Sequence, residues 1–255
     1  MSKLLEMFRH PLTKDMDIDA PESTIHRRKI IKEKEFLNKI YCEWYSLLTS
    51  DLRNPELQIL EIGSGAGFLD DYLPNVITSE VFPLDGVDRV EDATNLSFEA
   101  ESLDAIVMTD VFHHIPDVSK FLAEALRTLR SGGKLVMIEP WNTPWSRFFY
   151  RNFHPEPFEP TVLDWRLPKG GPLSSANGAL PWVVFVRDQA LFGDSNRKLQ
   201  LKSVVPLMPM AYIASGGIST ALGLPGFFYR IIRFLEKFVL REKGAMFALI
   251  SLEKI

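Results

Sequence analysis

The sequence is poor in the features that mark secreted, membrane-spanning and nucleic-acid-binding proteins. Its 255 residues include one cysteine, Cys42, so no internal disulfide can form. No uncharged apolar run reaches the roughly 18 residues that a spanning helix needs, and the first residues carry charges in place of an apolar export segment. A formal charge of −4 leaves no excess of positive charge to hold a phosphate backbone. We therefore expect a cytoplasmic protein with no integral membrane segment and no nucleic-acid partner.

Apolar runs of strand length alternate with helical patterns through the middle of the chain. Four runs have strand character, at 58–62, 76–81, 105–109 and 135–139. Between the last two, apolar residues recur at helical spacing from Val118 to Leu129. This alternation predicts an α/β fold, a parallel sheet with helices on its faces. We also expect one amphipathic helix within 23–52, and a last strand at 245–252 that closes the sheet at an antiparallel edge.

Three glycines stand at every second position just after the first of these runs. Gly63, Gly65 and Gly67 lie where a strand would turn into a helix, and glycine there permits positive φ and close approach of a ligand to the backbone. A dinucleotide fingerprint needs its third glycine at position 68, which is Phe68. The loop therefore argues against NAD or FAD and favours another nucleotide-type cofactor, the alternative being a purely structural turn.

This loop and three later segments resemble, in the same order, motifs of the class I S-adenosylmethionine-dependent methyltransferases. The later segments are 90–98, which holds an Asp-Ala pair, 103–117 and 129–136. The resemblance covers roughly residues 57 to 140. It implies a Rossmann-like, doubly wound, mostly parallel seven-stranded sheet with an antiparallel edge strand, which binds S-adenosylmethionine at the carboxyl ends of its strands.

The resemblance also implies which residues hold this cofactor. Glu61 and the glycine loop would hold its methionine and ribose end, Glu80 its ribose hydroxyls and Asp92 its adenine. Only 11 residues separate Glu80 from Asp92, too few for the usual helix, so Asp85 or Asp88 remains an alternative ribose partner. The expected cofactor residues are Glu61, Gly63, Ser64, Gly65, Gly67, Glu80, Asp92, Ala93 and Asp110.

Residues 141–196 differ in composition from the rest of the chain. The stretch from Pro140 to Pro181 holds eight of the 17 prolines, and residues 141–165 hold eight aromatics. Dense proline argues against regular helix, and dense aromatics need burial. We expect an irregular cap over the acceptor pocket, or else an aromatic core without ligand contact. We expect a single domain. It would consist of an N-terminal helical extension (1–56), a cofactor-binding half (57–140), the cap (141–196) and a part that completes the sheet (197–255).

A hydroxyl or phenol acceptor needs a base poised near neutral pH, which makes histidine the first candidate. His154 and His114 are the two candidates for this catalytic base, with Glu156 orienting or charging the imidazole. Purely structural roles for these residues, and for His113, remain open. No cysteine cluster is present, and the adjacent His113-His114 pair lacks the i, i+4 spacing of ligands on a helix, so no metal site is expected.

The expected function is methyl transfer from S-adenosylmethionine to a small, lipid-linked or sugar-linked metabolite. The alternative is a non-catalytic partner or sensor protein that binds the same cofactor. Neither the acceptor nor the oligomeric state can be read from the sequence. A helix at 227–241 has basic residues opposite its apolar stripe, which is typical of a membrane-surface helix. We expect that stripe to pack on the sheet, and peripheral membrane contact is the alternative.

Overall fold

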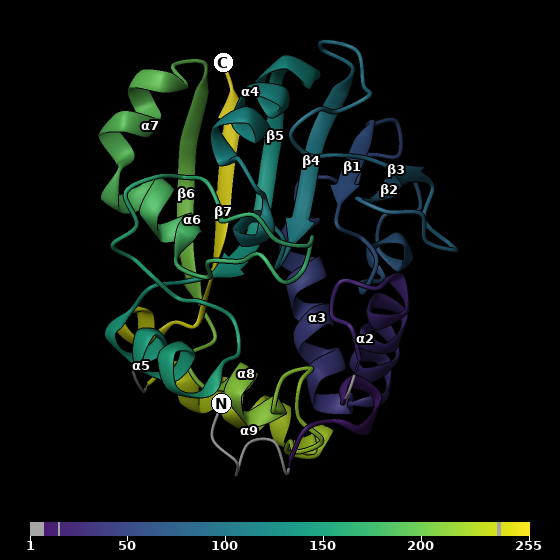
Figure 1. Ribbon diagram of the computed structural model, residues 1–255, viewed down its shortest axis with the longest axis vertical. Coiled ribbons are helices and arrows are strands. Elements are labelled where there is room, and N and C mark those ends of the chain that lie inside the picture. Colours follow the sequence, from purple (N-terminus) through teal and green to yellow (C-terminus); the bar gives the residue numbers. More distant parts are fainter. Residues whose placement is uncertain (1–7, 15, 239–240) are drawn as a thin grey trace.

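A seven-stranded sheet organises the protein (Figure 1). The computed structural model describes residues 8–14, 16–238 and 241–255. Within them the strand order is β3-β2-β1-β4-β5-β7-β6. The strands are β1 (Ile59–Ile62), β2 (Val76–Glu80), β3 (Arg89–Val90), β4 (Leu103–Thr109), β5 (Leu129–Pro140), β6 (Leu199–Leu207) and β7 (Phe247–Lys254). β1 to β5 are parallel, whereas β7 runs antiparallel to β5 and β6 antiparallel to β7. The α/β, Rossmann-like fold is therefore confirmed.

The antiparallel edge is formed by a strand that the sequence did not reveal. We expected the last strand to close the sheet, but β7 lies inside it, between β5 and β6. β6 forms the edge and contains Pro206. An edge strand tolerates proline because one side of its backbone needs no partner.

Helices cover both faces of the sheet. On one face, α4 (Val118–Thr128) packs beside α6 (Leu180–Trp182), the π-helical turn η4 (Val183–Arg187) and α7 (Gln189–Ser195). On the other face, α3 (Glu35–Leu48) contributes seven buried aromatic and aliphatic side chains, and α8 (Ala211–Ser215) also packs in this core. The carboxyl ends of the parallel strands point toward α2, α3, α5 and α8 in Figure 1.

The N-terminal segment contains two helices where we expected one. After η1 (Pro11–Thr13), α2 spans Pro21–Glu33, and α3 starts at Glu35. The break falls at Lys34, whose ammonium donates to the carbonyls of Gly217, Thr220 and Leu222 at 2.7, 3.0 and 2.9 Å. The break thus depends on a distant loop, which local periodicity cannot reveal.

The cap is more regular than its proline content suggested. Residues 144–153 form a regular helix, α5 (Pro144–Phe153). Pro144 occupies its first turn, where no N–H is needed, and Thr143 and Ser146 form a capping box. The expectation of an irregular cap was therefore wrong for this part. The irregular stretch runs over 154–179, and Leu180, Val183, Val184, Phe185 and Phe192 belong to the main core.

The remaining connections are short helices and turns. η2 (Leu69–Asp71) follows the glycine loop in place of a long helix, and a turn joins β2 to β3.

Near the C-terminus lie η5 (Gly226–Phe228), α9 (Tyr229–Glu236) and η6 (Arg241–Gly244). α9 lies beside α8, away from the sheet (Figure 1), and Ile231, Leu235 and Phe238 are exposed. The expected packing of this stripe was therefore wrong for these three side chains, whereas Phe228 and Ile232 do pack against the core. No helix within the described ranges is both long and apolar enough to cross a bilayer.

Candidate active site

A cavity of about 220 Å³ opens at the carboxyl ends of β1, β2 and β4. The chain leaves β1 toward β2 on one side and reaches β4 on the other, so this is the switch point at which doubly wound sheets bind ligands. Five of the expected cofactor residues line it, namely Gly63, Glu80, Asp92, Ala93 and Asp110. Glu61, Ser64, Gly65 and Gly67 do not line this cavity.

Each glycine of the loop after β1 has a steric reason to lack a side chain. Gly63 has a φ of +72°, and a Cβ there would lie 2.5 Å from Val111 Cγ2. At Gly65 a Cβ would collide with Thr24 and lie 2.6 Å from Glu80 Oε1. At Gly67 it would collide with the hydroxyl of Tyr45. The loop is therefore pressed between α2, α3 and the end of β2.

Residues behind the loop stabilise its shape. Ser64 Oγ accepts a hydrogen bond from the Ser79 N–H at 3.1 Å. Ser79 Oγ in turn donates to the Glu61 carbonyl at 2.7 Å. The side chain of Glu61 is 3% exposed, and burial raises its pKa to about 7. Glu61 and Ser64 thus support the loop from behind rather than facing the cavity.

Among the three candidate ribose partners, Glu80 alone borders this first cavity. Its Oε1 accepts the Gly65 N–H at 3.0 Å, and burial raises the pKa of this carboxyl. Asp88 accepts from the N–H and hydroxyl of Thr78 at 2.9 and 2.8 Å, and it lines a separate hollow together with Asp85. The geometry therefore favours Glu80 over the two aspartates.

A second cavity of about 180 Å³ adjoins the first. The two share lining residues at Arg27, Asp110, His114, Leu173 and Ile218. The other walls of the second cavity include 153–156, which follow α5, and parts of the N-terminal segment. A ligand in either cavity would therefore reach the same short wall around Asp110.

Asp110 has an unusual backbone and an unusual carboxyl group. It follows β4 with a φ of +61°, a conformation that non-glycine residues rarely adopt. Burial raises the pKa of its carboxyl to about 7. Local strain of this kind is concentrated at functional sites, which fits its place between the two cavities.

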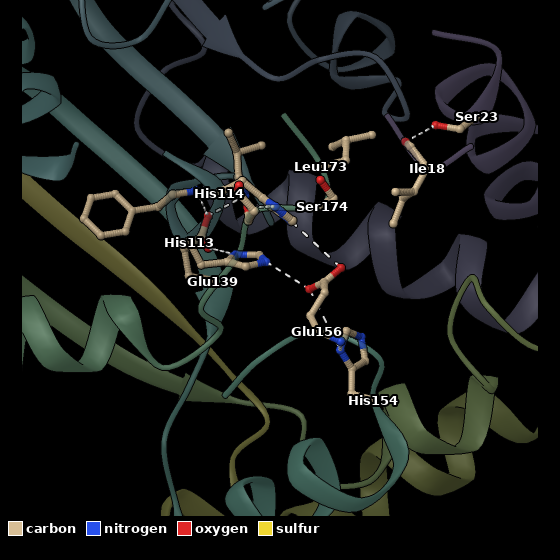
Figure 2. A network of polar contacts seen from close by, with 12 residues as sticks. Ile18, Ser23, His113, His114, Glu139, His154, Glu156, Leu173 and Ser174 are labelled. Atoms are coloured by element: carbon tan, nitrogen blue, oxygen red, sulfur yellow. Dashed lines mark hydrogen bonds and ion pairs between the residues drawn. The ribbon is translucent and has the colours of Figure 1, made fainter. Parts of the chain in front are cut away.

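A buried network of histidines and carboxylates lies next to this wall (Figure 2). Glu139, near the end of β5, accepts the N–H groups of Val111 and Phe112, both at 2.8 Å. Its other oxygen lies 2.7 Å from Nδ1 of His113, which belongs to η3 (Phe112–His114). His113 Nε2 lies 3.4 Å from Glu156. Although burial lowers the pKa of His113, these two carboxylates raise it well above its usual range. His113 is thus a cation held between two anions.

Glu139 should contribute strongly to the stability of the fold. Replacing it with alanine would leave two buried N–H groups without an acceptor and remove one partner of the His113 cation. Breaking a buried ion pair from one side typically costs about 3–5 kcal/mol. We therefore expect Glu139→Ala to lower the free energy of unfolding in urea by about this amount, and Glu139→Gln, which keeps an acceptor oxygen, by less. A loss below about 1 kcal/mol for Glu139→Ala would contradict this role.

The other two histidines of the network are held in their neutral form. His114 Nδ1 lies 3.0 Å from the Ser175 carbonyl, so Nδ1 carries the proton and Nε2 keeps its lone pair. Burial lowers the pKa of His114 to about 4 and also lowers that of His154. His154 Nδ1 accepts the Glu156 N–H at 3.3 Å. His114 therefore presents a free lone pair near Glu156, whereas the Nδ1 lone pair of His154 is already engaged.

Glu156 joins the three histidines. Its carboxylate lies 3.4 Å from His113 Nε2, 4.0 Å from His114 Nε2 and 3.9 Å from His154 Nδ1. Although burial raises the pKa of Glu156, the protonated His113 beside it holds this pKa well below its usual range. Glu156 is therefore a fixed negative charge beside the second cavity.

The same cluster is the part of the described chain in which a metal ion could be held. Ligand atoms of His113, His114 and Glu156 all lie within 4.8 Å of one another, a grouping that chain spacing did not indicate. Protonated imidazole has no lone pair to offer a metal, and His113 is held in that form. We therefore interpret the cluster as a proton-holding network, and the absence of a metal site stays a prediction.

Some residues of the two cavities had no signal in the sequence. Arg27 of α2 lines both cavities and makes no ion pair with a described carboxylate. Leu173 also lines both, because Asp19 accepts the N–H groups of Leu173 and Ser174 at 2.7 and 2.8 Å. Asp19 thereby ties the N-terminal segment to the cap. Such contacts join residues about 150 positions apart, which no local pattern reveals.

Comparisons with known proteins agree with this architecture. Residues 60–137 match the family model described as a methyltransferase domain. The phthiotriol/phenolphthiotriol dimycocerosates methyltransferase of Mycobacterium tuberculosis is 45% identical over 114 residues, which are 38% of this chain and 42% of that protein. The chloroplastic 2-methyl-6-phytyl-1,4-hydroquinone methyltransferase of Arabidopsis thaliana is 29% identical over 140 residues, 47% of this chain and 41% of that protein. The chain thus spans less than half the length of these curated relatives.

A solved structure extends the fold similarity to the whole chain. Geranyl diphosphate C-methyltransferase of Streptomyces coelicolor, solved with Mg²⁺, geranyl diphosphate and S-adenosyl-L-homocysteine, has a TM-score of 0.53 at 13% identity. The match covers 96% of this chain and 87% of that one. The fold and its switch-point cavity define a Rossmann-like nucleotide-cofactor protein. With the ordered motifs, the family match identifies residues 60–137 as a methyltransferase domain, similar to those of the class I S-adenosylmethionine-dependent methyltransferases.

Proposed function

We propose that the protein methylates a hydroxyl group of a lipid-linked metabolite, with S-adenosylmethionine as the methyl donor. One observation carries the proposal, namely two adjoining cavities that share Asp110 and His114. Methyl transfer requires donor and acceptor in line across a short distance, with water excluded. The lipid class follows from the relatives, whose names specify phthiotriol dimycocerosates and a phytyl hydroquinone as acceptors.

The charged and polar residues of the first cavity can each pair with a polar group of S-adenosylmethionine. We assign the ribose hydroxyls to Glu80, the adenine edge to Asp92 and Ala93, and the ammonium of the methionine part to Asp110. Arg27 offers a positive charge for the carboxylate of that part. S-adenosylmethionine supplies a sulfonium-bound methyl group, and the chain positions it by these contacts and by the narrow loop around Gly65.

Glu80 provides a direct test of this assignment. Removing a charged acceptor that faces a buried ligand group should cost about 1.5–3 kcal/mol, a ten- to hundred-fold loss in affinity. We therefore expect Glu80→Ala to weaken binding of S-adenosylhomocysteine by that factor in calorimetry. Asp85→Ala is the matched control and should bind like wild type, because Asp85 lies outside the cavity. If Asp85→Ala weakened binding and Glu80→Ala did not, the ribose partner would be Asp85 in the turn between β2 and β3.

On the acceptor side, we assign the base to His114. Its Nε2 lone pair faces the second cavity and can accept the proton of the acceptor hydroxyl as the oxygen is methylated. The nearby Glu156 carboxylate then stabilises the imidazolium that forms. His154 and Glu156 hold each other in place through the bond from the Glu156 N–H to His154 Nδ1. Aromatic residues such as Phe153 and Tyr212 shield the second cavity from water.

The pH dependence of turnover follows from the state of His114. A base acts only when deprotonated, and burial lowers the pKa of His114 to about 4. We therefore expect the contribution of His114 to kcat to stay constant through the range near 6.5, where an ordinary histidine would become protonated, and to decline only as the pH approaches 4. The measurement is the wild-type to His114→Asn ratio of kcat from pH 5 to 8. A ratio that falls with a midpoint near 6.5 would contradict the neutral, buried state.

The activity itself is tested with the methyl donor and a lipid extract. The protein is incubated with methyl-labelled S-adenosylmethionine and total bacterial lipid, and both S-adenosylhomocysteine release and label in the organic phase are measured. We expect both to rise together, and the label to be bound to oxygen. Binding of S-adenosylhomocysteine without release from any lipid or polar extract would instead indicate the non-catalytic alternative.

A further inference from the structure

The segment that ends in α9 exposes an unusual amount of apolar surface. Seven of the 17 large hydrophobic side chains exposed in the described part of the chain lie within residues 222–238. They are Leu222, Leu224, Phe227, Ile231, Phe234, Leu235 and Phe238. Phe227 and Phe238 are both 66% exposed, although phenylalanine is among the residue types most often fully buried. Contiguous apolar surface of this kind marks an interaction site.

Five of these side chains follow the spacing of one helical face, with Ile231, Phe234 and Leu235 in α9, Phe227 in η5 and Phe238 in the turn after α9. Phe227, Ile231, Phe234, Leu235 and Phe238 follow one another at the i, i+4, i+7, i+8, i+11 spacing of a helical stripe. We call this stripe the outer face of α9. The inner face is fixed to the protein, because Phe228 and Ile232 pack on the core and Arg233 pairs with Glu43 of α3 and with buried Glu236. Because the inner face is packed against the protein, the outer face is left exposed to solvent.

Two basic side chains border the outer face. Arg230 and Lys237 are exposed and lie along one edge of the stripe, whereas Glu236, the acidic residue of this segment, is 3% exposed. The whole chain carries a formal charge of −4, so this positive edge is local. An apolar face bordered by basic residues is the pattern of helices that lie in the interface of anionic membranes.

Residues that line the second cavity lie at the same end of the molecule as the outer face. α5, α8 and α9 lie at the same end of the molecule (Figure 1). Phe153, at the end of α5, is 45% exposed and lines that cavity. So does Thr220, which directly precedes the exposed stretch 221–225. A long apolar acceptor could therefore enter the second cavity from the same end of the molecule that would lie on a membrane.

We propose that the outer face of α9 docks the protein on the surface of an anionic lipid bilayer. A second copy of the chain fits less well, since a symmetric dimer would bring the Arg230 and Lys237 side chains of both copies together. The docking itself depends on α9 alone, and only the delivery of an acceptor rests on the proposed function.

Vesicle flotation tests this docking directly. The full chain is mixed with phosphatidylcholine vesicles that contain or lack phosphatidylglycerol, and the floated fraction is measured. We expect stronger binding to the anionic vesicles, with about a fivefold loss for Arg230→Gln, since one basic residue near such a surface contributes about that factor. The triple variant F227S/F234S/F238S should lose binding at least about tenfold.

A matched control separates this surface from general hydrophobicity. The triple variant L163S/V186S/L191S removes exposed apolar side chains elsewhere and should bind vesicles like wild type. Both variants should bind S-adenosylhomocysteine unchanged, which verifies their fold and keeps docking separate from the proposed activity. Vesicle binding that is equal in wild type and F227S/F234S/F238S would overturn the proposal. So would a stable dimer that F227S/F234S/F238S converts to a monomer, with no vesicle binding by either.

Discussion

The Gly65→Val variant should lose measurable affinity for S-adenosylhomocysteine, at least about a hundred-fold against wild type. A Cβ at this position would collide with Thr24 and lie 2.6 Å from Glu80 Oε1. The branched side chain would therefore push α2 away from the loop and displace the carboxyl group that we assign to the ribose. It would also disturb the 3.0 Å bond from the Gly65 N–H to Glu80. Calorimetric titration with S-adenosylhomocysteine measures this loss.

Gly193→Val is the matched control for this prediction. Gly193 lies in α7, and a Cβ there would meet nothing within 4 Å. The control should bind like wild type, which separates the effect of a valine from the effect of its position. If Gly65→Val retains the affinity of wild type, the loop is a structural turn and the cavity beside it is not the cofactor site.

His114→Asn should lower kcat by about 10²-fold, the lower end of the usual contribution of a general base, because a pKa of about 4 makes His114 a weaker base than an ordinary histidine. Asparagine can still donate to the Ser175 carbonyl but offers no lone pair at the position of Nε2. The affinity for S-adenosylhomocysteine should change little, because the base faces the acceptor. Single-turnover rates with a saturating acceptor measure the chemical step.

The comparison with His154 decides between the two candidates. His154→Asn should retain kcat within about tenfold of wild type, because its Nδ1 already accepts the Glu156 N–H. A large loss in this variant and a small one in His114→Asn would move the role of base to His154. If both variants turn over within a few-fold of wild type, neither histidine is the base.

The sheet could be predicted because its parallel strands are short apolar runs with clear turns between them. β6 escaped detection, since Pro206 and Pro209 interrupt the apolar pattern and only its pairing with β7 makes it a strand. The break at Lys34 depends on carbonyl groups more than 180 positions away. α5 was missed because proline was taken as a helix breaker, although at the first turn it is compatible with a helix.

In the candidate site, too, some residues could be predicted from the sequence and others could not. The loop glycines, Glu80 and Asp92 could be located from ordered motifs, since a motif fixes residues within one strand-to-helix connection. The network around Glu156 could be proposed only in part, because it joins η3, β5 and the cap through side-chain contacts. Arg27 and Leu173 line the cavities because the N-terminal segment packs on the cap. Such packing between distant segments produces no recognisable pattern of residue spacing in the sequence.

A crystal structure with bound S-adenosylhomocysteine tests the central claim most directly. The account predicts the adenine beside Asp92, the ribose hydroxyls on Glu80 and the sulfur at the wall near Asp110, with its open side toward His114. A sulfur that faces away from the second cavity would contradict it, since a methyl group on that atom could not reach an acceptor beside His114. So would a ligand bound anywhere other than the cavity at the ends of β1, β2 and β4.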